Sequence, residues 1–347
     1  MKFRFRNNIE EMAGYVPGQQ PTDASVIKIN TNENPYPPSP KVLEALAKLD
    51  GEVLRKYPPV FWDDFRRAAA QIHGVDEAMV VGGNGGDEIL TMLVRCCCDK
   101  GRALAYPVPT YSLYPVLAKI QDAPVIEVPF DKGGQIPAEL PKVKAGLTIL
   151  CNPNAPTGTQ VEAEPVRQLA RQLSGVLLID EAYVDFAEHN CLELLSDCEN
   201  VVILRSMSKG YSLAGMRFGY ALGSQRIVEA MIKVKDSYNV NIAAQAAATA
   251  ALLDQDYFLE NIRKVKEERN RLTAAIRKLG FELGESQSNF LLAKITQPAA
   301  KEVYEKLAQR NILIRYFNLE GLEDKVRITV GSREQNDALL AALKEIL

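Results

Sequence analysis

The sequence predicts an α/β protein in which a mostly parallel, seven-stranded sheet is covered by helices and joined to a smaller α+β unit. Short apolar runs of strand length alternate with helical patterns through the middle of the chain, which is typical of a parallel sheet buried on both faces. After about residue 225 this alternation ends. The runs that we expect to form buried strands of the large sheet are 78–81, 103–106, 125–128, 147–151, 176–179, 201–204 and 218–222.

Helical patterns lie between several of these runs, for example at 87–98 and 164–173. In open sheets of this kind, a ligand binds beyond the carboxyl ends of the strands. Residues that directly follow the predicted strands are therefore the first candidates for functional side chains.

The smaller unit begins with a long, charged helical stretch at 255–279. Short strands and further helices follow it, and a strand-like segment near the N-terminus can join them. Further strands are expected at 26–29, 289–293, 313–316 and 326–330, and further helices at 299–309 and 333–347.

These patterns divide the chain into two domains. The proline-rich stretch 34–40 is typical of a crossing between units. We therefore expect residues 31–250 to form the large domain, and residues 1–30 and 251–347 to form the small domain together.

Charge and hydropathy restrict the partners of the protein. The 347 residues carry a net charge of −3, with a pI of about 5.7, so neither a nucleic acid nor an anionic membrane is an expected partner. The basic start of the chain lacks the apolar segment of a secretory signal, and no apolar run reaches the length of a membrane span. A cytoplasmic protein with small-molecule partners is the expectation.

Cysteine and histidine usage does not indicate a metal centre. Three of the six cysteines, Cys96 to Cys98, are consecutive, which suits neither a disulfide framework nor regular metal-ligand spacing. With only two histidines, a His-rich site is not expected either. We interpret the cysteines as free thiols of a reduced compartment and expect no metal.

The segment 201–217 carries the most informative chemistry. A predicted strand ends among the hydroxyls of Ser206 and Ser208, which precede Lys209, and Arg217 follows eight residues later. A lysine amine can form an imine with an aldehyde, and a nearby cation favours its neutral form. The two hydroxyls and the guanidinium group can hold a phosphate. A single lysine after a strand is usually only a surface charge, so the interpretation needs support from other segments.

The strand at 176–179 supplies such support, because it delivers Asp180 at its carboxyl end. A carboxylate at this place can keep a pyridinium nitrogen protonated, although an acidic residue after a strand can also be a cap. Tyr183, three residues further on, can donate to a phenolic oxygen on the same ring.

Other strand ends carry compatible groups. A glycine-rich turn at 82–88 opens a predicted helix, so the backbone of Gly85 and Gly86 can approach an anion, while Asp87 caps the helix. Tyr111 can stack on an aromatic ring or belong to the core. A polar, proline-rich turn follows the strand at 147–151. Five strand ends together therefore suit one phosphorylated pyridine aldehyde.

These residues resemble the fold-type I pyridoxal-phosphate enzymes and, within them, the class II aminotransferases, most of all the histidinol-phosphate aminotransferase family. The resemblance covers nearly the whole chain, from the segment at 14–18 to that at 326–331. It implies that Lys209 forms the Schiff base with the cofactor, that Asp180 pairs with the ring nitrogen and that Tyr183 binds the phenolic oxygen. The remaining cofactor residues that it implies are Tyr111 for stacking, and Ser206, Ser208, Arg217 and the backbone of Gly85, Gly86 and Asp87 for the phosphate.

One position departs from the family pattern. The family usually has an asparagine directly before Pro-Thr-Gly, and its amide binds the phenolic oxygen, whereas this chain has Ala155 there and Asn154 before it. Either Asn154 takes over this contact or the oxygen relies on Tyr183 alone.

The resemblance also implies the substrates and the assembly. Arg327 is similar to the arginine that meets the substrate carboxylate, and Arg315 and Tyr15 to residues that face a substrate phosphate. Tyr57 resembles a tyrosine that reaches the cofactor phosphate of a neighbouring subunit, so a homodimer with shared sites is implied. The implied reaction is transamination of histidinol phosphate with 2-oxoglutarate in histidine biosynthesis.

Three alternatives remain open from the sequence. Threonine-phosphate decarboxylases use similar motifs and a phosphorylated substrate, and aromatic aminotransferases overlap in substrate. A pyridoxal-phosphate-binding regulator is the non-enzymatic alternative. No basic helix-turn-helix segment lies in the first thirty residues, which disfavours the regulator.

Overall fold

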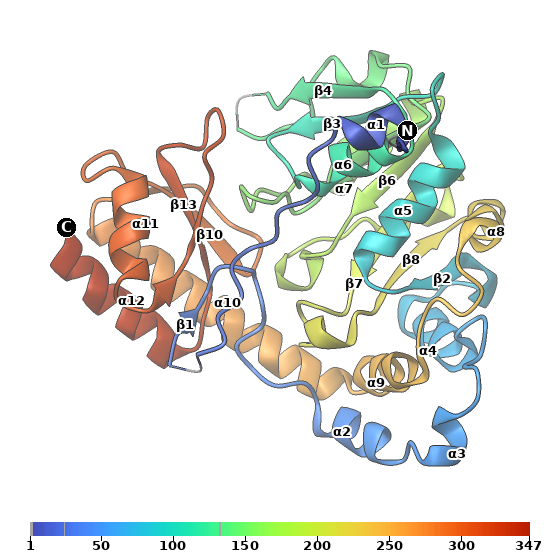
Figure 1. The fold of residues 1–347 in the computed structure, drawn as a ribbon, viewed down its shortest axis with the longest axis horizontal. Helices are drawn as coiled ribbons and strands as arrows, with labels where there is room; N and C mark the ends of the chain where they lie inside the picture. Colours follow the sequence, from blue (N-terminus) through green and yellow to red (C-terminus); the bar gives the residue numbers. More distant parts are fainter. Residues whose placement is uncertain (1–2, 24, 132) are drawn as a thin grey trace.

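A seven-stranded sheet forms the larger part of the protein. The computed structural model describes residues 3–23, 25–131 and 133–347. The order of the strands is β2-β8-β7-β6-β5-β3-β4. The smaller part lies at the left in Figure 1, and the long helix α10 runs into it from the large part. The strands are β2 (Val80–Gly83), β3 (Leu104–Val108), β4 (Val125–Pro129), β5 (Leu147–Cys151), β6 (Val176–Asp180), β7 (Val201–Ser206) and β8 (Gly219–Gly223).

The predicted strand number and the mostly parallel arrangement of this sheet are confirmed. Strand β8 is antiparallel to both of its neighbours, β2 and β7, while the other pairs are parallel. Six strands, β2 to β7, therefore run in the same direction and end at the same edge. The expectation that every run is buried is wrong for β4, which leaves Val125 37% exposed. Strand β2 at the opposite edge is buried because α4, α5 and α8 pack against it, whereas no helix among the described residues packs against β4 to a similar extent.

Most of the helices that cover the large sheet have one apolar side. In α5, for example, Ile89, Leu90 and Leu93 are buried, while acidic residues occupy the exposed first turn, where they favour the helix dipole. The helices of this part are α2 (Pro40–Ala47), α3 (Gly51–Leu54), α4 (Asp63–His73), α5 (Gly86–Cys97), α6 (Leu113–Ile120), α7 (Ala163–Gln172), α8 (Gln225–Val234) and α9 (Ile242–Leu252). Short 3₁₀ turns occur at Glu77–Met79, Leu140–Lys142, Val184–Phe186, Leu192–Ser196 and Ala214–Met216.

The smaller part has its own sheet and its own apolar core. Its antiparallel strands have the order β12-β13-β10-β9, and Leu272, Phe281 and Leu343 are among the buried residues between sheet and helices. The strands are β9 (Glu282–Leu283), β10 (Phe290–Lys294), β11 (Ile312–Leu313), β12 (Arg315–Tyr316) and β13 (Lys325–Thr329), and the helices are α10 (Gln255–Lys278), α11 (Ala300–Ala308) and α12 (Arg333–Ile346).

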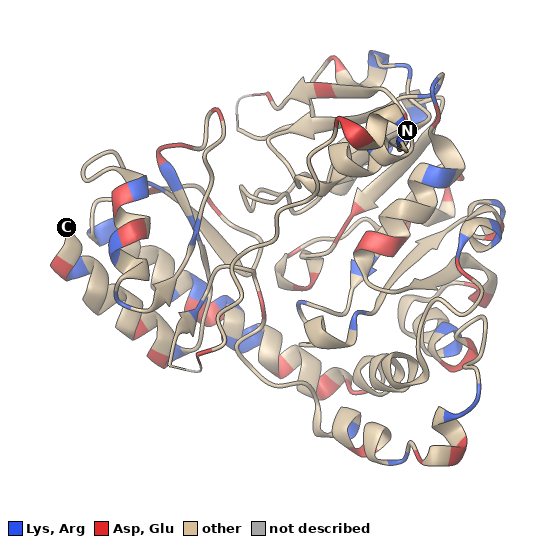
Figure 2. Ribbon diagram, viewed as in Figure 1, with Lys and Arg blue, Asp and Glu red and all other residues tan. Residues whose placement is uncertain are grey.

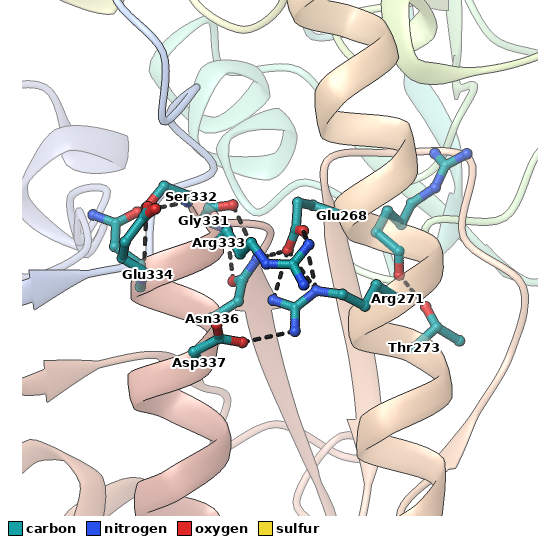
Figure 3. Close-up of polar contacts among 11 residues, drawn as sticks. Glu268, Arg271, Thr273, Gly331, Ser332, Arg333, Glu334, Asn336 and Asp337 are labelled. Carbon is teal, nitrogen blue, oxygen red and sulfur yellow. Dashed lines mark hydrogen bonds and ion pairs between the residues drawn. The ribbon is translucent and has the colours of Figure 1, made fainter.

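A cluster of charged and amide side chains joins α10 to the start of α12, and we call it the α10–α12 clamp: Glu268, Arg271, Asn336 and Asp337 (Figure 3). Arg271 donates to both oxygens of Glu268 at 2.8–3.0 Å and to Asp337 Oδ1 at 2.7 Å. Asn336 is completely buried, donates to Glu268 Oε2 at 3.1 Å and bonds both backbone groups of Gly331 at 3.0 Å. The clamp therefore fixes the turn between β13 and α12.

The N-terminal arm contacts both parts of the molecule. Its short helix α1 (Asn7–Glu10) lies against α6, where Asn8 Nδ2 donates to the carbonyl oxygen of Lys119 at 2.7 Å. Strand β1 (Ile27–Lys28) pairs in parallel with β11 of the smaller part. The predicted domain boundaries at residues 30 and 250 stay a prediction, since the arm takes part in both regions.

Charges are mixed along the helices rather than segregated by sign. Figure 2 shows acidic and basic residues interspersed along α10, where pairs such as Arg263 with Glu260 and Glu267 lie three and four residues apart. Among the described residues, no helix combines the length and the apolar character needed to cross a membrane.

Candidate active site

The shared carboxyl edge of the parallel strands brings together side chains that are far apart in the sequence. Asp180 is the last residue of β6, and Lys209 follows β7 by three residues. The Nζ atom of Lys209 lies 5.6 Å from the centre of the Tyr183 ring. The predicted convergence of these strand ends is therefore present in the fold.

Lys209 is partly buried and makes one side-chain hydrogen bond among the described residues. Its Nζ atom donates to the carbonyl oxygen of Thr31 at 3.2 Å. Burial, and to a lesser extent the positive charge of Arg327, lower the pKa of Lys209 to about 8. The amine is therefore much closer to its neutral, nucleophilic form at physiological pH than a surface lysine is.

Asp180 is 4% exposed and is held by two donors. The hydroxyl group of Tyr114 donates to Oδ2 at 2.6 Å, and the backbone N–H of Ala182 donates to Oδ1 at 3.1 Å. Burial raises the pKa of Asp180, although both hydrogen bonds oppose this effect. A buried carboxylate of this kind favours a cation beside it, such as a protonated ring nitrogen.

Tyr183 packs edge-on against Phe290 of the small sheet, with ring centres 5.1 Å apart. Its hydroxyl oxygen accepts a hydrogen bond from Asn32 Nδ2 at 2.9 Å. Burial raises the pKa of Tyr183 to about 12, so the hydroxyl remains protonated and able to donate at neutral pH.

The start of α5 provides a cradle for an anion. Gly85 caps this helix with a φ of 84°, and a Cβ atom at Gly85 would lie only 2.6 Å from Arg217 Nη2. Only glycine lets the guanidinium group lie so close to the free N–H groups of the first turn. Arg217 Nη2 also lies 3.3 Å from Asp87 Oδ2, and Ser206 Oγ accepts from the N–H of Ser208 at 3.2 Å.

Aromatic side chains form one wall of the site. The ring centre of Tyr111 lies 6.0 Å from that of Tyr15 in the N-terminal arm and 5.6 Å from that of Tyr114. The Tyr111 hydroxyl group donates to Asp87 Oδ1 at 3.4 Å. The predicted stacking residue is thus joined to both the anion cradle and the arm.

Two arginines of the small sheet face each other across neighbouring strands. Arg315 of β12 and Arg327 of β13 are register partners, and Arg327 Nη2 donates to the carbonyl oxygen of Asn30 at 3.1 Å. The ring of Phe317 lies between them, 5.5 Å from Arg315 Cζ and 5.4 Å from Arg327 Cζ. Burial lowers the pKa of Arg327, as does the neighbouring Arg315, so an anion at this place would be strongly attracted.

Asn154 does not point a free amide into the site. Its Nδ2 atom donates to the carbonyl oxygen of Pro109 and to Thr157 Oγ1, both at 3.0 Å, and its Oδ1 atom accepts from Thr110 Oγ1 at 2.9 Å. Both amide protons are therefore used to hold the turn. Of the two alternatives for the phenolic oxygen, this geometry favours the one that relies on Tyr183, because a contact from Asn154 requires a spare amide proton. The role of Asn154 stays a prediction.

Tyr57 lies apart from the other candidate residues. It follows the last residue of α3 by three positions and is 79% exposed. Helix α3 lies at the lower end of the large part in Figure 1. Its ring stacks on that of Tyr238 with centres 4.3 Å apart. Among the described residues, no hydrogen bond joins the Tyr57 side chain to the cluster around Lys209, and the role of Tyr57 stays a prediction.

Four residues to which the sequence assigned no role also belong to the site: Thr31, Asn32, Tyr114 and Phe317. Asn32 lies in the stretch 32–35, which resembles a family motif. The only other local signal was the helical spacing of three residues between Tyr111 and Tyr114. Thr31 and Asn32 contact residues more than 150 positions away, and the role of Phe317 depends on the pairing of β12 with β13. No local pattern predicts such contacts.

The residues present fit pyridoxal phosphate. This cofactor needs an amine, a carboxylate and an anion site. The chain offers Lys209 with a lowered pKa, the buried carboxylate of Asp180, and an anion cradle that a side chain at Gly85 would fill. Fold and site together define a pyridoxal-phosphate-dependent enzyme of fold type I.

Comparisons with known proteins agree with this class. The sequence model of the family described as aminotransferase class I and II matches residues 24–343. Histidinol-phosphate aminotransferase 1 of Nostoc sp. is 49% identical over 345 residues, covering 99% of this chain and 98% of the relative. Histidinol-phosphate aminotransferase of Citrifermentans bemidjiense is 46% identical over 343 residues, covering 98% of each.

A solved structure is also similar over the full length. The crystal structure of histidinol-phosphate aminotransferase from Sinorhizobium meliloti in complex with pyridoxal-5'-phosphate has a TM-score of 0.90 and 27% identity, covering 100% of this chain and 98% of that chain. This chain therefore belongs to the class I and II aminotransferase family and, within it, to the histidinol-phosphate aminotransferases.

Proposed function

We propose that this protein catalyses the reversible amino transfer between histidinol phosphate and 2-oxoglutarate in histidine biosynthesis, where glutamate is the amino donor and histidinol phosphate the product. The pairing of Arg315 with Arg327 across β12 and β13, beside Lys209, carries this proposal. Two guanidinium groups suit a substrate with a dianionic phosphate or, in the second half of the reaction, a dicarboxylate. The relatives named above act on histidinol phosphate according to their names, which supports the same substrate.

Each polar residue at the sheet edge has a proposed role. When bound, pyridoxal phosphate supplies an electron sink for the carbon that carries the amino group. Lys209 Nζ would hold the cofactor between turnovers. Once free, it would take the proton from that substrate carbon and deliver it to the former aldehyde carbon of the cofactor. Asp180 holds the proton on the ring nitrogen, and Tyr183 donates to the phenolic oxygen.

The other residues bind and orient. The start of α5 at Gly85 to Asp87, together with Ser206, Ser208 and Arg217, holds the cofactor phosphate, and Tyr111 stacks on the ring. Arg327 binds the carboxylate of 2-oxoglutarate, whereas Arg315 and Tyr15 meet the substrate phosphate.

A second copy of the chain completes the site in this proposal. Tyr57 is exposed, and Val53, Leu54 and Phe61, which are near it in the sequence, are exposed apolar side chains. Burying these side chains between two subunits would place Tyr57 at the partner's cofactor phosphate. The six free cysteines agree with a cytoplasmic location, which we also propose.

Amino transfer to the bound cofactor gives an absorbance change that tests the proposed substrate. The protein loaded with pyridoxal phosphate is mixed separately with histidinol phosphate, phenylalanine and threonine phosphate. We expect the change to be fastest with histidinol phosphate. A faster change with phenylalanine would favour an aromatic aminotransferase, release of carbon dioxide from threonine phosphate would favour a decarboxylase, and no change with any amine would leave a cofactor-binding regulator.

A further inference from the structure

Asn32 lies where the large sheet meets the small one, and every part of it is held. It is 1% exposed and has a φ of 58°, a conformation that asparagine tolerates better than most residues. Its backbone N–H donates to Thr329 Oγ1 at 3.0 Å, and its carbonyl oxygen accepts from Asn289 Nδ2 at 3.0 Å. The position of Asn32 is therefore fixed by β13 and by the start of β10.

The direction of the Asn32 amide follows from these contacts. The Oδ1 atom accepts from Thr329 Oγ1 at 3.0 Å, so the NH₂ group must point the other way, toward the Tyr183 hydroxyl oxygen at 2.9 Å. Because that oxygen accepts from Asn32, the hydroxyl proton of Tyr183 is free to point outward into the site. The same hydrogen bond opposes the effect of burial on the pKa of Tyr183 and so makes the hydroxyl a better donor.

We propose that Asn32 is a positioning residue of the reaction, which fixes the Tyr183 hydroxyl group as the donor to the phenolic oxygen of bound pyridoxal phosphate. This inference rests on the role proposed above for Tyr183. Asn154 Nδ2 already donates to the carbonyl oxygen of Pro109 and to Thr157 Oγ1, and Ala155 has no hydrogen-bonding side chain. In this geometry neither Asn154 nor Ala155 offers a further donor to the phenolic oxygen, so that contact depends on Tyr183 and on Asn32, which holds it.

The inference predicts a spectroscopic effect. A donor to the ring oxygen would stabilise negative charge there and would therefore favour the deprotonated form of the bound cofactor. Asn32→Asp keeps the size of the side chain and tolerates the same φ, but its carboxylate would take the Tyr183 proton for itself. We expect the pH midpoint of the cofactor absorbance change in the holoenzyme to rise by about 0.5–1 unit, the scale of one hydrogen bond.

A matched variant separates this effect from general destabilisation. Asn336→Asp makes the same chemical change at a completely buried asparagine of the α10–α12 clamp. It should lower Tm without moving the absorbance midpoint. If Asn32→Asp fails to fold, Thr329→Val replaces it, since losing the hydroxyl group releases the Asn32 amide while a β-branched side chain still suits the strand. A smaller rise of the midpoint is expected from that variant.

Tyr183→Phe makes the possible failures distinguishable. We expect it to raise the midpoint at least as much as Asn32→Asp does, and the double variant should show no further rise. A shift with Tyr183→Phe but none with a folded Asn32→Asp or Thr329→Val would overturn the role of Asn32 alone. No shift with Tyr183→Phe would overturn both roles, that of Tyr183 and that of Asn32.

Discussion

The charged side chains of the α10–α12 clamp and those at the edge of the large sheet differ in how many of their polar atoms have hydrogen-bond partners. In the α10–α12 clamp, both oxygens of Glu268 accept from Arg271, and Asn336 adds a third donor (Figure 3). At the sheet edge, Arg327 has a buried Nε atom without a partner among the described residues, and Lys209 makes a single side-chain hydrogen bond there.

The difference separates structural from functional polar groups. A buried charge without partners costs free energy, so a fold without a ligand gains nothing from keeping Lys209 and Arg327 underused. Bound anions and an aldehyde would supply the missing partners. The clamp, in contrast, is complete within the chain. Substitutions in the two places should therefore have opposite effects on stability and on activity.

Lys209→Ala should give the largest effect of all. The variant loses the amine that binds the cofactor and moves the proton, so we expect transamination to fall by at least about 10³-fold. Because a poorly solvated cation is removed, Tm of the cofactor-free protein should not fall. Steady-state kinetics and thermal unfolding check both parts, and wild-type activity in this variant would contradict the proposed mechanism.

Glu268→Ala should lower the stability of the protein and leave its activity almost unchanged, the reverse of Lys209→Ala. It leaves Arg271 and Asn336 without their shared acceptor inside the small domain, and we expect a loss of about 3 kcal/mol in the free energy of unfolding. The kcat per folded, cofactor-loaded molecule should stay near that of the wild type. Denaturant unfolding measures the first quantity, and a large fall in kcat with unchanged stability would remove the distinction between the two groups.

Arg327→Lys, compared with Arg271→Lys, sharpens the contrast with one chemical change. A lysine cannot keep the forked hydrogen bonds of a guanidinium group, so Arg327→Lys should lower kcat/KM for 2-oxoglutarate by about 100-fold. Arg271→Lys weakens the clamp, and we expect it to lower Tm with little change in kcat/KM. Equal losses of kcat/KM in both variants would argue against a substrate-binding role for Arg327.

The smallest effect concerns pH and stability. Since the pKa of Lys209 is lowered from 10.5 to about 8, the unfolded chain binds this proton more tightly than the folded chain does. The lysine therefore destabilises the cofactor-free protein fully below pH 8, and the penalty fades as the pH rises toward 10.5. Lys209→Met should raise Tm at pH 7 and lose this advantage near pH 10, which thermal unfolding at several pH values would show.

Several features of the site could be predicted from the sequence because they depend on local pattern. The strand ends before Asp180 and Lys209, and the glycine-rich turn before α5, are local features, and β5 has the predicted bounds. The direction of the Asn154 amide was not predictable, because it depends on how Pro109 and Thr157 fold around it. The exposure of β4 depends likewise on its place in the sheet order.

The sequence by itself determined the order of strands and helices along the chain and the set of chemical groups that follow the parallel strands. Both depend on periodicity and turn residues, which act over a few positions. Only the tertiary structure decided which of these groups contact one another. Asn32 meets Tyr183 across 151 positions, and Thr31 meets Lys209 across 178. Such contacts form only when the large and the small apolar cores have packed and residues 31 and 32 lie against the edge of the large sheet. No local sequence pattern encodes contacts between segments so far apart.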